Sequence, residues 1–179
     1  MRLNQVLTCA MLLLVWAPVA SGQSFELYGS AGPTVTDKGQ SVAAGVGVSP
    51  TSRLTLLGSI ERTHLSGGSR RDANSISYFR GGTYLLGSGE LRFAPRGRDH
   101  VGPFVVGGFA AGVSRPNVND VFPTPVTNAA RALFVGGGIL VPLGPRFTAF
   151  ADARMLIGAE GIEGIVAVAP VRAGVAWRF

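Results

Sequence analysis

The chain has 179 residues, a formal net charge of +6, 46% hydrophobic and 15% charged residues, and 26 glycines. This length suits one domain, and the apolar fraction is too high and the charge too sparse for a disordered chain. Cys9 is the only cysteine, which excludes a disulfide scaffold. No apolar run of about 20 residues follows the N-terminus, which excludes a helical membrane bundle. The basic residues are scattered along the chain, so we expect no nucleic-acid partner.

Residues 1–22 are typical of a secretory signal peptide. Arg2 provides the basic start, an apolar run from Val6 to Val15 broken only by Thr8 follows, and Ala20 and Gly22 are the small residues of a cleavage site. The apolar run is too short for a permanent membrane helix. We therefore expect cleavage after Gly22 and an exported mature domain over residues 23–179.

The mature chain alternates between apolar and polar residues with period two, which is typical of β-strands with two different faces. Pro- and Gly-containing turns separate the alternating segments. Eight strands are predicted, at residues 25–35, 41–49, 54–65, 76–93, 101–114, 130–141, 147–157 and 165–179. No segment has a helical repeat, so we predict an all-β fold with antiparallel neighbours.

One face of these segments is free of charge and the other is not. In the last segment every second residue from Ile165 to Phe179 is apolar, whereas Arg172 and Arg178 lie on the opposite face. A soluble barrel would bury the apolar face, whereas a transmembrane barrel turns it toward lipid and keeps a polar interior. Alternation alone does not separate these two classes.

The charges on the polar face favour an enclosed interior. Acids and arginines are nearly balanced there, and the strands contain no lysine, which an ordinary solvated face would include. Buried charges need partners, and the planar guanidinium of arginine binds a carboxylate at two points. The predicted lumen network consists of Glu26, Glu61, Arg80, Glu90, Arg92, Asp152, Arg154, Arg172 and Arg178.

Aromatic residues of the apolar face gather at strand ends. If the strands run up and down, five of them share one rim and form an interface girdle: Phe25, Phe93, Phe147, Trp177 and Phe179. The chain also ends on an alternating aromatic segment, Val175-Ala176-Trp177-Arg178-Phe179. This segment resembles the C-terminal signal that the assembly machinery reads in bacterial outer-membrane barrels.

Together with the signal peptide, the mature chain is similar to the small eight-stranded outer-membrane barrels of the OmpA/OmpX type. The resemblance implies a closed antiparallel up-and-down barrel in the outer membrane, in contact with outer-membrane lipid and lipopolysaccharide. It further implies recognition by the assembly machinery through Val175, Trp177 and Phe179.

An even number of strands places both ends of the domain at the periplasmic rim. The extracellular connections are then residues 36–40, 66–75, 115–128 and 158–164, and the Pro-rich loop 115–128 is a candidate for contact with an extracellular partner. Arg62 and His64 have the parity of the lipid face, so strand three should already have left the bilayer there. Pro170 should interrupt the last strand, by a bulge or at the membrane boundary.

We expect the interior to be filled rather than open, because an eight-stranded barrel is about wide enough for side chains alone. Five rings should point inward beside the charges: Tyr28, Tyr84, Phe104, Phe134 and Phe150. The favoured function is structural or surface-interacting, with no catalysis, cofactor or metal.

Three alternatives are open. They are a narrow ion channel, a soluble exported barrel for a lipophilic ligand and, least favoured, an enzyme that resembles the lipid A deacylases through His64-Leu65-Ser66.

Overall fold

The computed structural model describes residues 24–35, 38–66, 68–72, 75–79, 81–118, 124, 127–160 and 165–179. Among these residues no helix is long and apolar enough to cross a membrane. The strands are β1 (Ser24–Thr34), β2 (Gly39–Ser49), β3 (Leu54–Leu65), β4 (Gly68–Asp72), β5 (Ser75–Phe79), β6 (Gly82–Phe93), β7 (Gly102–Pro116), β8 (Asn128–Pro142), β9 (Phe147–Glu160), β10 (Ile165–Val168) and β11 (Val171–Arg178).

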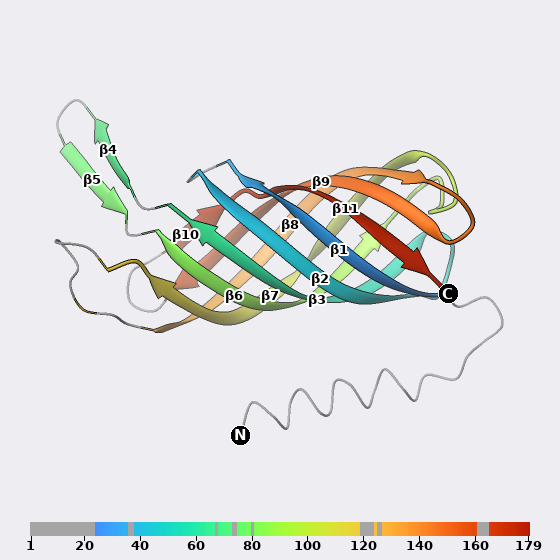
Figure 1. The fold of residues 1–179 in the computed structure, drawn as a ribbon, viewed down its shortest axis with the longest axis horizontal. Coiled ribbons are helices and arrows are strands. Elements are labelled where there is room, and N and C mark those ends of the chain that lie inside the picture. The colour runs from blue at the N-terminus through green and yellow to red at the C-terminus, as the bar shows by residue number, and fades with distance from the viewer. Residues whose placement is uncertain are drawn as a thin grey trace, which may run out of the picture.

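The predicted fold is confirmed: eight antiparallel strands close into an up-and-down barrel. Each barrel strand pairs with the next along the chain, and β11 closes the ring by pairing with both β9 and β1. β10 and β11 together form the eighth strand, since both pair with β9 (Figure 1). The ladder between β1 and β11 joins the two ends of the sheet, so the wall has no free strand edge along this stretch.

The strands are strongly staggered around the barrel. Leu27 faces Trp177 on one side, but the pairing followed the other way around the ring reaches the eighth strand at Ala167. Ala167 lies ten residues before Trp177. A stagger of this size requires the strands to tilt against the barrel axis, as Figure 1 shows.

The prediction of one strand over residues 76–93 is wrong. The segment divides into β5 and β6, and β5 pairs with β4 as a separate hairpin that projects beyond the barrel (Figure 1). Gly81 and Gly82 lie at the division with φ of 58° and 139°, values that residues with a side chain rarely adopt. Strand β6 itself continues through Gly87 and Gly89 without a turn, as predicted.

The interruption predicted at Pro170 is present, between β10 and β11. No bulge accompanies it, because Ala167 opposite Ile157 and Val171 opposite Ala153 keep one register across the break. The carbonyl of Pro170 still accepts from Arg154 N at 3.0 Å. The proline therefore removes a donor without shifting the strand.

The apolar face points outward and the charged face inward. Val175 and Trp177 are 47% and 42% exposed, whereas Arg154 and Arg172 are 3% and 1% exposed. Buried apolar residues also lie inside, among them Phe104 and Leu140. This is the polarity of a transmembrane barrel and the reverse of a soluble one.

The two ends of the barrel differ. Strand β1 begins and β11 ends at one, the terminal end, where short turns join β2 to β3, β6 to β7 and β8 to β9. The hairpin β4–β5 marks the other, the hairpin end (Figure 1).

Candidate functional site: the charged interior

Alternation along the strands brings the predicted network together. All of its described members are buried inside the barrel: Glu26, Glu61, Glu90, Arg92, Asp152, Arg154, Arg172 and Arg178. Arg80 lies outside the described residues. Four carboxylates therefore face four guanidinium groups in a space that water barely reaches, and each charge needs a specific partner.

Arg172 occupies the centre of this network. Its Nη1 donates to Glu61 Oε2 at 3.0 Å, while its Nε and Nη2 donate to the two carboxylate oxygens of Asp152 at 3.1 and 3.0 Å. The contact with Asp152 is bidentate, a geometry that lysine cannot provide. Because Glu61 lies on β3 and Asp152 on β9, these bonds tie together strands that are not neighbours in the sheet.

Arg154 continues the network from Asp152 to Glu90. Its Nε lies 3.0 Å from Asp152 Oδ2 and its Nη2 lies 2.8 Å from Glu90 Oε2, with the guanidinium 5.1 Å from the centre of the Phe134 ring. The other oxygen of Glu90 accepts from Ser59 Oγ at 3.1 Å. Charge-assisted bonds of this kind are stronger than neutral ones and hold their members in one arrangement.

Hydroxyl groups satisfy the remaining carboxylate oxygens. Glu61 Oε1 accepts from Ser41 Oγ at 2.7 Å and from Thr63 Oγ1 at 3.0 Å. Glu90 Oε1 also accepts from Ser88 Oγ at 2.9 Å and Tyr28 OH at 3.3 Å. These serines and threonines belong to the polar face of their strands, but parity alone did not single them out.

A second ion pair lies nearer the terminal end. Arg92 Nη1 donates to Glu26 Oε1 at 3.1 Å. The Arg92 guanidinium also lies 5.2 Å from the ring centre of Phe104, 5.3 Å from that of Phe150 and 6.0 Å from that of Tyr28. Aromatic faces attract a guanidinium, most of all where water is excluded.

Arg178 has a partner that the sequence analysis missed. It pairs with Asp99, which lies in the turn between β6 and β7. That turn folds back over the terminal end, where Arg98 N donates to the carbonyl of Ser52 at 2.8 Å. A turn residue has no strand parity, so only the folded structure reveals this contact.

Glycines opposite rings make room for the interior aromatics. Four rings face a glycine directly across the strand pair: Tyr28–Gly45, Phe104–Gly138, Phe134–Gly108 and Phe150–Gly174. A Cβ at Gly174 would lie 2.5 Å from Phe150 Cζ, and one at Gly45 would lie 2.6 Å from Tyr28 Cε1. Tyr84, the fifth predicted ring, is half-buried and faces Ser114 instead.

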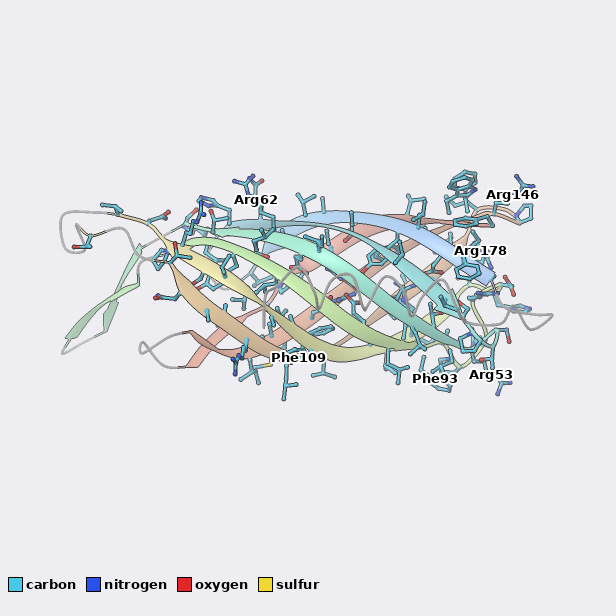
Figure 2. The ribbon with its side chains drawn as sticks, turned by 90° about the horizontal axis from the view of Figure 1, so that it is seen from below. Arg53, Arg62, Phe93, Phe109, Arg146 and Arg178 are labelled. Atoms are coloured by element: carbon cyan, nitrogen blue, oxygen red, sulfur yellow. The ribbon has the colours of Figure 1, made fainter. Side chains whose placement is uncertain are left out.

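The predicted girdle residues lie at the terminal end, on the outer surface. Phe25 stacks on Phe179 with ring centres 6.3 Å apart, Trp177 lies 5.4 Å from Phe179, and Phe147 is the cross-strand partner of Trp177. Phe93 points outward at the same end (Figure 2). Phe109 lies midway along the wall and also points outward (Figure 2).

The histidine and serine of the deacylase-like element have separate partners. His64 Nδ1 lies 3.2 Å from Thr83 Oγ1, and Ser66 Oγ donates to the carbonyl of Lys38 at 3.1 Å. Both Arg62 and His64 are exposed on the outer wall near the hairpin end (Figure 2 for Arg62). Within the described ranges, no three His, Cys, Asp or Glu side chains gather as metal ligands would. Half of loop 115–128, residues 119–123, 125 and 126, lies outside the described residues.

Comparison with known proteins gives structural matches without matching sequences. No protein-family model matches the chain, and no curated protein matches it significantly. The N-terminal barrel domain of Pseudomonas aeruginosa OprF is similar with a TM-score of 0.61 and 15% identity, covering 87% of this chain and 97% of that one. Neisserial surface protein A gives a TM-score of 0.62 and 12% identity, over 88% and 96% of the two chains.

The Yersinia pestis attachment invasion locus protein Ail, solved with the heparin analogue sucrose octasulfate, gives a TM-score of 0.53 and 15% identity, over 89% of this chain and 100% of that one. The closed barrel, its outward apolar face and these matches together show that the chain has the fold of the small eight-stranded outer-membrane barrels.

Proposed function

We propose that the protein is an integral outer-membrane barrel whose lumen is closed to the diffusion of solutes. It acts, without catalysis, through the surface it displays. The apolar outer wall supports the membrane location, because exposed leucines, valines and isoleucines cover the strands from Leu27 to Val175. In water this wall would be an aggregation-prone surface, whereas in a bilayer it contacts acyl chains.

Exposed basic residues border the apolar wall at both ends. They are Lys38, Arg62, His64, Arg115 and Arg131 toward the hairpin end, and Arg53, Arg96, His100 and Arg146 at the terminal end. The described carboxylate side chains of the barrel strands all lie inside: Glu26, Glu61, Glu90 and Asp152. Two basic rims suit the phosphate groups of outer-membrane lipid and lipopolysaccharide, which would meet the wall at these depths.

The buried network is the main observation that supports a closed lumen. The chain of contacts Glu61–Arg172–Asp152–Arg154–Glu90 crosses the interior, and the four large rings fill the space beside it. The two described interior cavities each have room for about one water molecule. A continuous aqueous path would require several of these ion pairs to break together.

Conductance in planar lipid bilayers tests this proposal. We expect the folded wild-type protein to produce no stable conductance steps between about pH 5 and pH 8. The double variant Phe104→Ala, Phe150→Ala removes two rings from the interior and should admit small steps, which shows that the assay detects an opened lumen. Stable, pH-sensitive steps from the wild type would instead support the narrow ion channel.

Cell fractionation and gel mobility test the location. We expect the protein in the outer-membrane fraction, with faster migration before boiling than after it, because a closed barrel in detergent resists unfolding. Recovery in the periplasm with one mobility would support the soluble lipophilic-ligand barrel.

The hairpin end is the candidate surface for recognition. The hairpin β4–β5 projects past the barrel and its sequence includes Arg70 and Arg71 (Figure 1). We include in the proposal that an extracellular partner contacts this hairpin or loop 115–128.

The proposal also includes recognition of Val175, Trp177 and Phe179 by the assembly machinery, since these side chains face outward on the last strand.

A further inference from the structure

The interior cavity at the terminal end carries an excess of positive charge. Arg92 from β6, Arg98 from the following turn and Arg178 from β11 all line it, whereas Glu26 is the single carboxylate among the described residues of its lining. Glu26 is already paired with Arg92. Asp99 pairs with Arg178 from the mouth, where its side chain is 57% exposed. Three guanidinium groups therefore share a small space with one buried carboxylate.

Several buried donors that line this cavity have no hydrogen-bond partner among the residues that the structure describes. They are Nε and Nη2 of Arg92, Nε and Nη1 of Arg98, Nε of Arg178 and Oγ1 of Thr148. Arg92, Arg178 and Thr148 are each more than nine-tenths buried. An unsatisfied buried donor costs about 1–3 kcal/mol and more when it is charged, so a cluster of them indicates a missing acceptor.

The Arg98 side chain is held in this unfavourable place by its turn. Ala94 N donates to the carbonyl of Arg53 and Arg98 N to the carbonyl of Ser52, both at 2.8 Å, which ties this turn to the neighbouring turn between β2 and β3. Burial, and then the positive charge of Arg178, lower the pKa of Arg98. A negative charge between the two guanidinium groups would remove the repulsion that this lowering reflects.

We propose that this cavity is a binding site for a small inorganic anion of about the size of chloride. Arg98, Arg178 and Arg92 supply charge-assisted donors, and the Thr148 hydroxyl supplies a neutral one. The space holds about one water-sized group, which favours a monatomic anion over a larger organic acid. Bound there, the anion bridges the β6–β7 turn to the barrel wall and completes the closure of the terminal end. This anion site is separate from the proposed function, because it depends only on the folded barrel and would bind the anion in detergent as well as in a membrane.

Bromide gives a direct test, because it resembles chloride and scatters X-rays anomalously. Crystals of the full chain grown in bromide should show an anomalous peak among Arg92, Arg98 and Thr148. Crystals of the Arg98→Gln variant should lack it.

A titration in solution provides the affinity. The unfolding midpoint of the detergent-folded protein is measured as chloride replaces gluconate at constant ionic strength. The wild-type midpoint should rise and saturate, because a ligand that binds the folded state stabilises it. Arg98→Gln and Thr148→Val should each weaken the apparent chloride affinity, the first at least about tenfold.

Arg53→Gln is the matched control, since Arg53 is an exposed arginine of the adjacent turn and does not line the cavity. It should respond to chloride as the wild type does. A shift in gel mobility on boiling establishes that each variant is folded before it is titrated. A wild-type midpoint that ignores chloride, with no bromide peak, means that the cavity holds only water. An undiminished response in Arg98→Gln means that chloride acts elsewhere. Either result overturns the proposal.

Discussion

At the scale of single residues, stability depends on a few buried charges that share partners. Asp152 is 3% exposed and accepts hydrogen bonds from both Arg172 and Arg154. Asp152→Asn keeps the shape but leaves two guanidinium groups without their common negative charge. We expect a loss of about 3–5 kcal/mol in the free energy of unfolding, the usual effect of removing one partner from a buried pair. Urea unfolding in lipid vesicles, followed by tryptophan fluorescence, measures it.

Asp99→Asn is the matched control for that substitution. Asp99 also pairs with an arginine, the buried Arg178, but its own side chain is more than half exposed, so water already screens the charge that the substitution removes. We expect a loss below about 1 kcal/mol. Equal losses in the two variants would show that burial does not set the strength of these pairs.

The residue scale also shows what the sequence could not reveal. Parity predicted that Asp152, Arg154 and Arg172 share a face, because alternation is a local property of each strand. It could not predict that Arg172 also reaches Glu61 on β3, because that contact depends on closure of the ring. Asp99 was missed for a related reason, since a turn residue has no face.

At the scale of elements, the register between strands decides how the interior is filled. Phe150 on β9 lies opposite Gly174 on β11, and a Cβ at Gly174 would meet both the ring and the carbonyl of Gly29. We expect Gly174→Ala to destabilise the barrel by about 1–3 kcal/mol, because overfilling a packed interior forces side chains or backbone to shift. The same urea titration in vesicles measures this loss.

Gly89→Ala separates overfilling from the general effect of changing a strand glycine. Gly89 also lies within a strand, but it faces outward and a Cβ there would meet nothing within 4 Å. We expect the free energy of unfolding to stay within about 0.5 kcal/mol of the wild type. A similar loss in both variants would contradict the role of the ring–glycine pairs.

Glycine also explains where the predicted elements were wrong. Residues 78–93 keep one alternation, and only Ile76 and Ser77 reverse it, so parity does not place the division at Gly81 and Gly82. The break occurs at Gly81 and Gly82, whose positive φ values turn the chain between β5 and β6. In contrast, Gly87 and Gly89 stay extended inside β6. The sequence contains both pairs, and only their pairing with neighbouring strands distinguishes a turn from a continuous strand.

At the scale of the whole molecule, the barrel is inverted with respect to a water-soluble protein. Its large apolar side chains cover the outer wall, and its ion pairs are enclosed in the interior. The stagger of the strands and the closed ring satisfy the backbone from within, which a hydrocarbon solvent requires. The closed fold, the charged interior and the apolar outer wall therefore all follow from one alternation of polar and apolar residues along the chain.

This inversion predicts a cost of surface charge that depends on depth. Phe109 points outward midway along the wall, and Phe93 points outward at its terminal end (Figure 2); they are 50% and 42% exposed. In a bilayer, Phe109→Arg should cost about 2–4 kcal/mol and Phe93→Arg about 0–1 kcal/mol, since an arginine at the rim reaches the head groups. Unfolding from lipid vesicles measures both. A barrel that resides in water would tolerate the two substitutions equally, because both side chains would meet the same solvent. Equal costs would therefore show that the outer wall does not contact a bilayer.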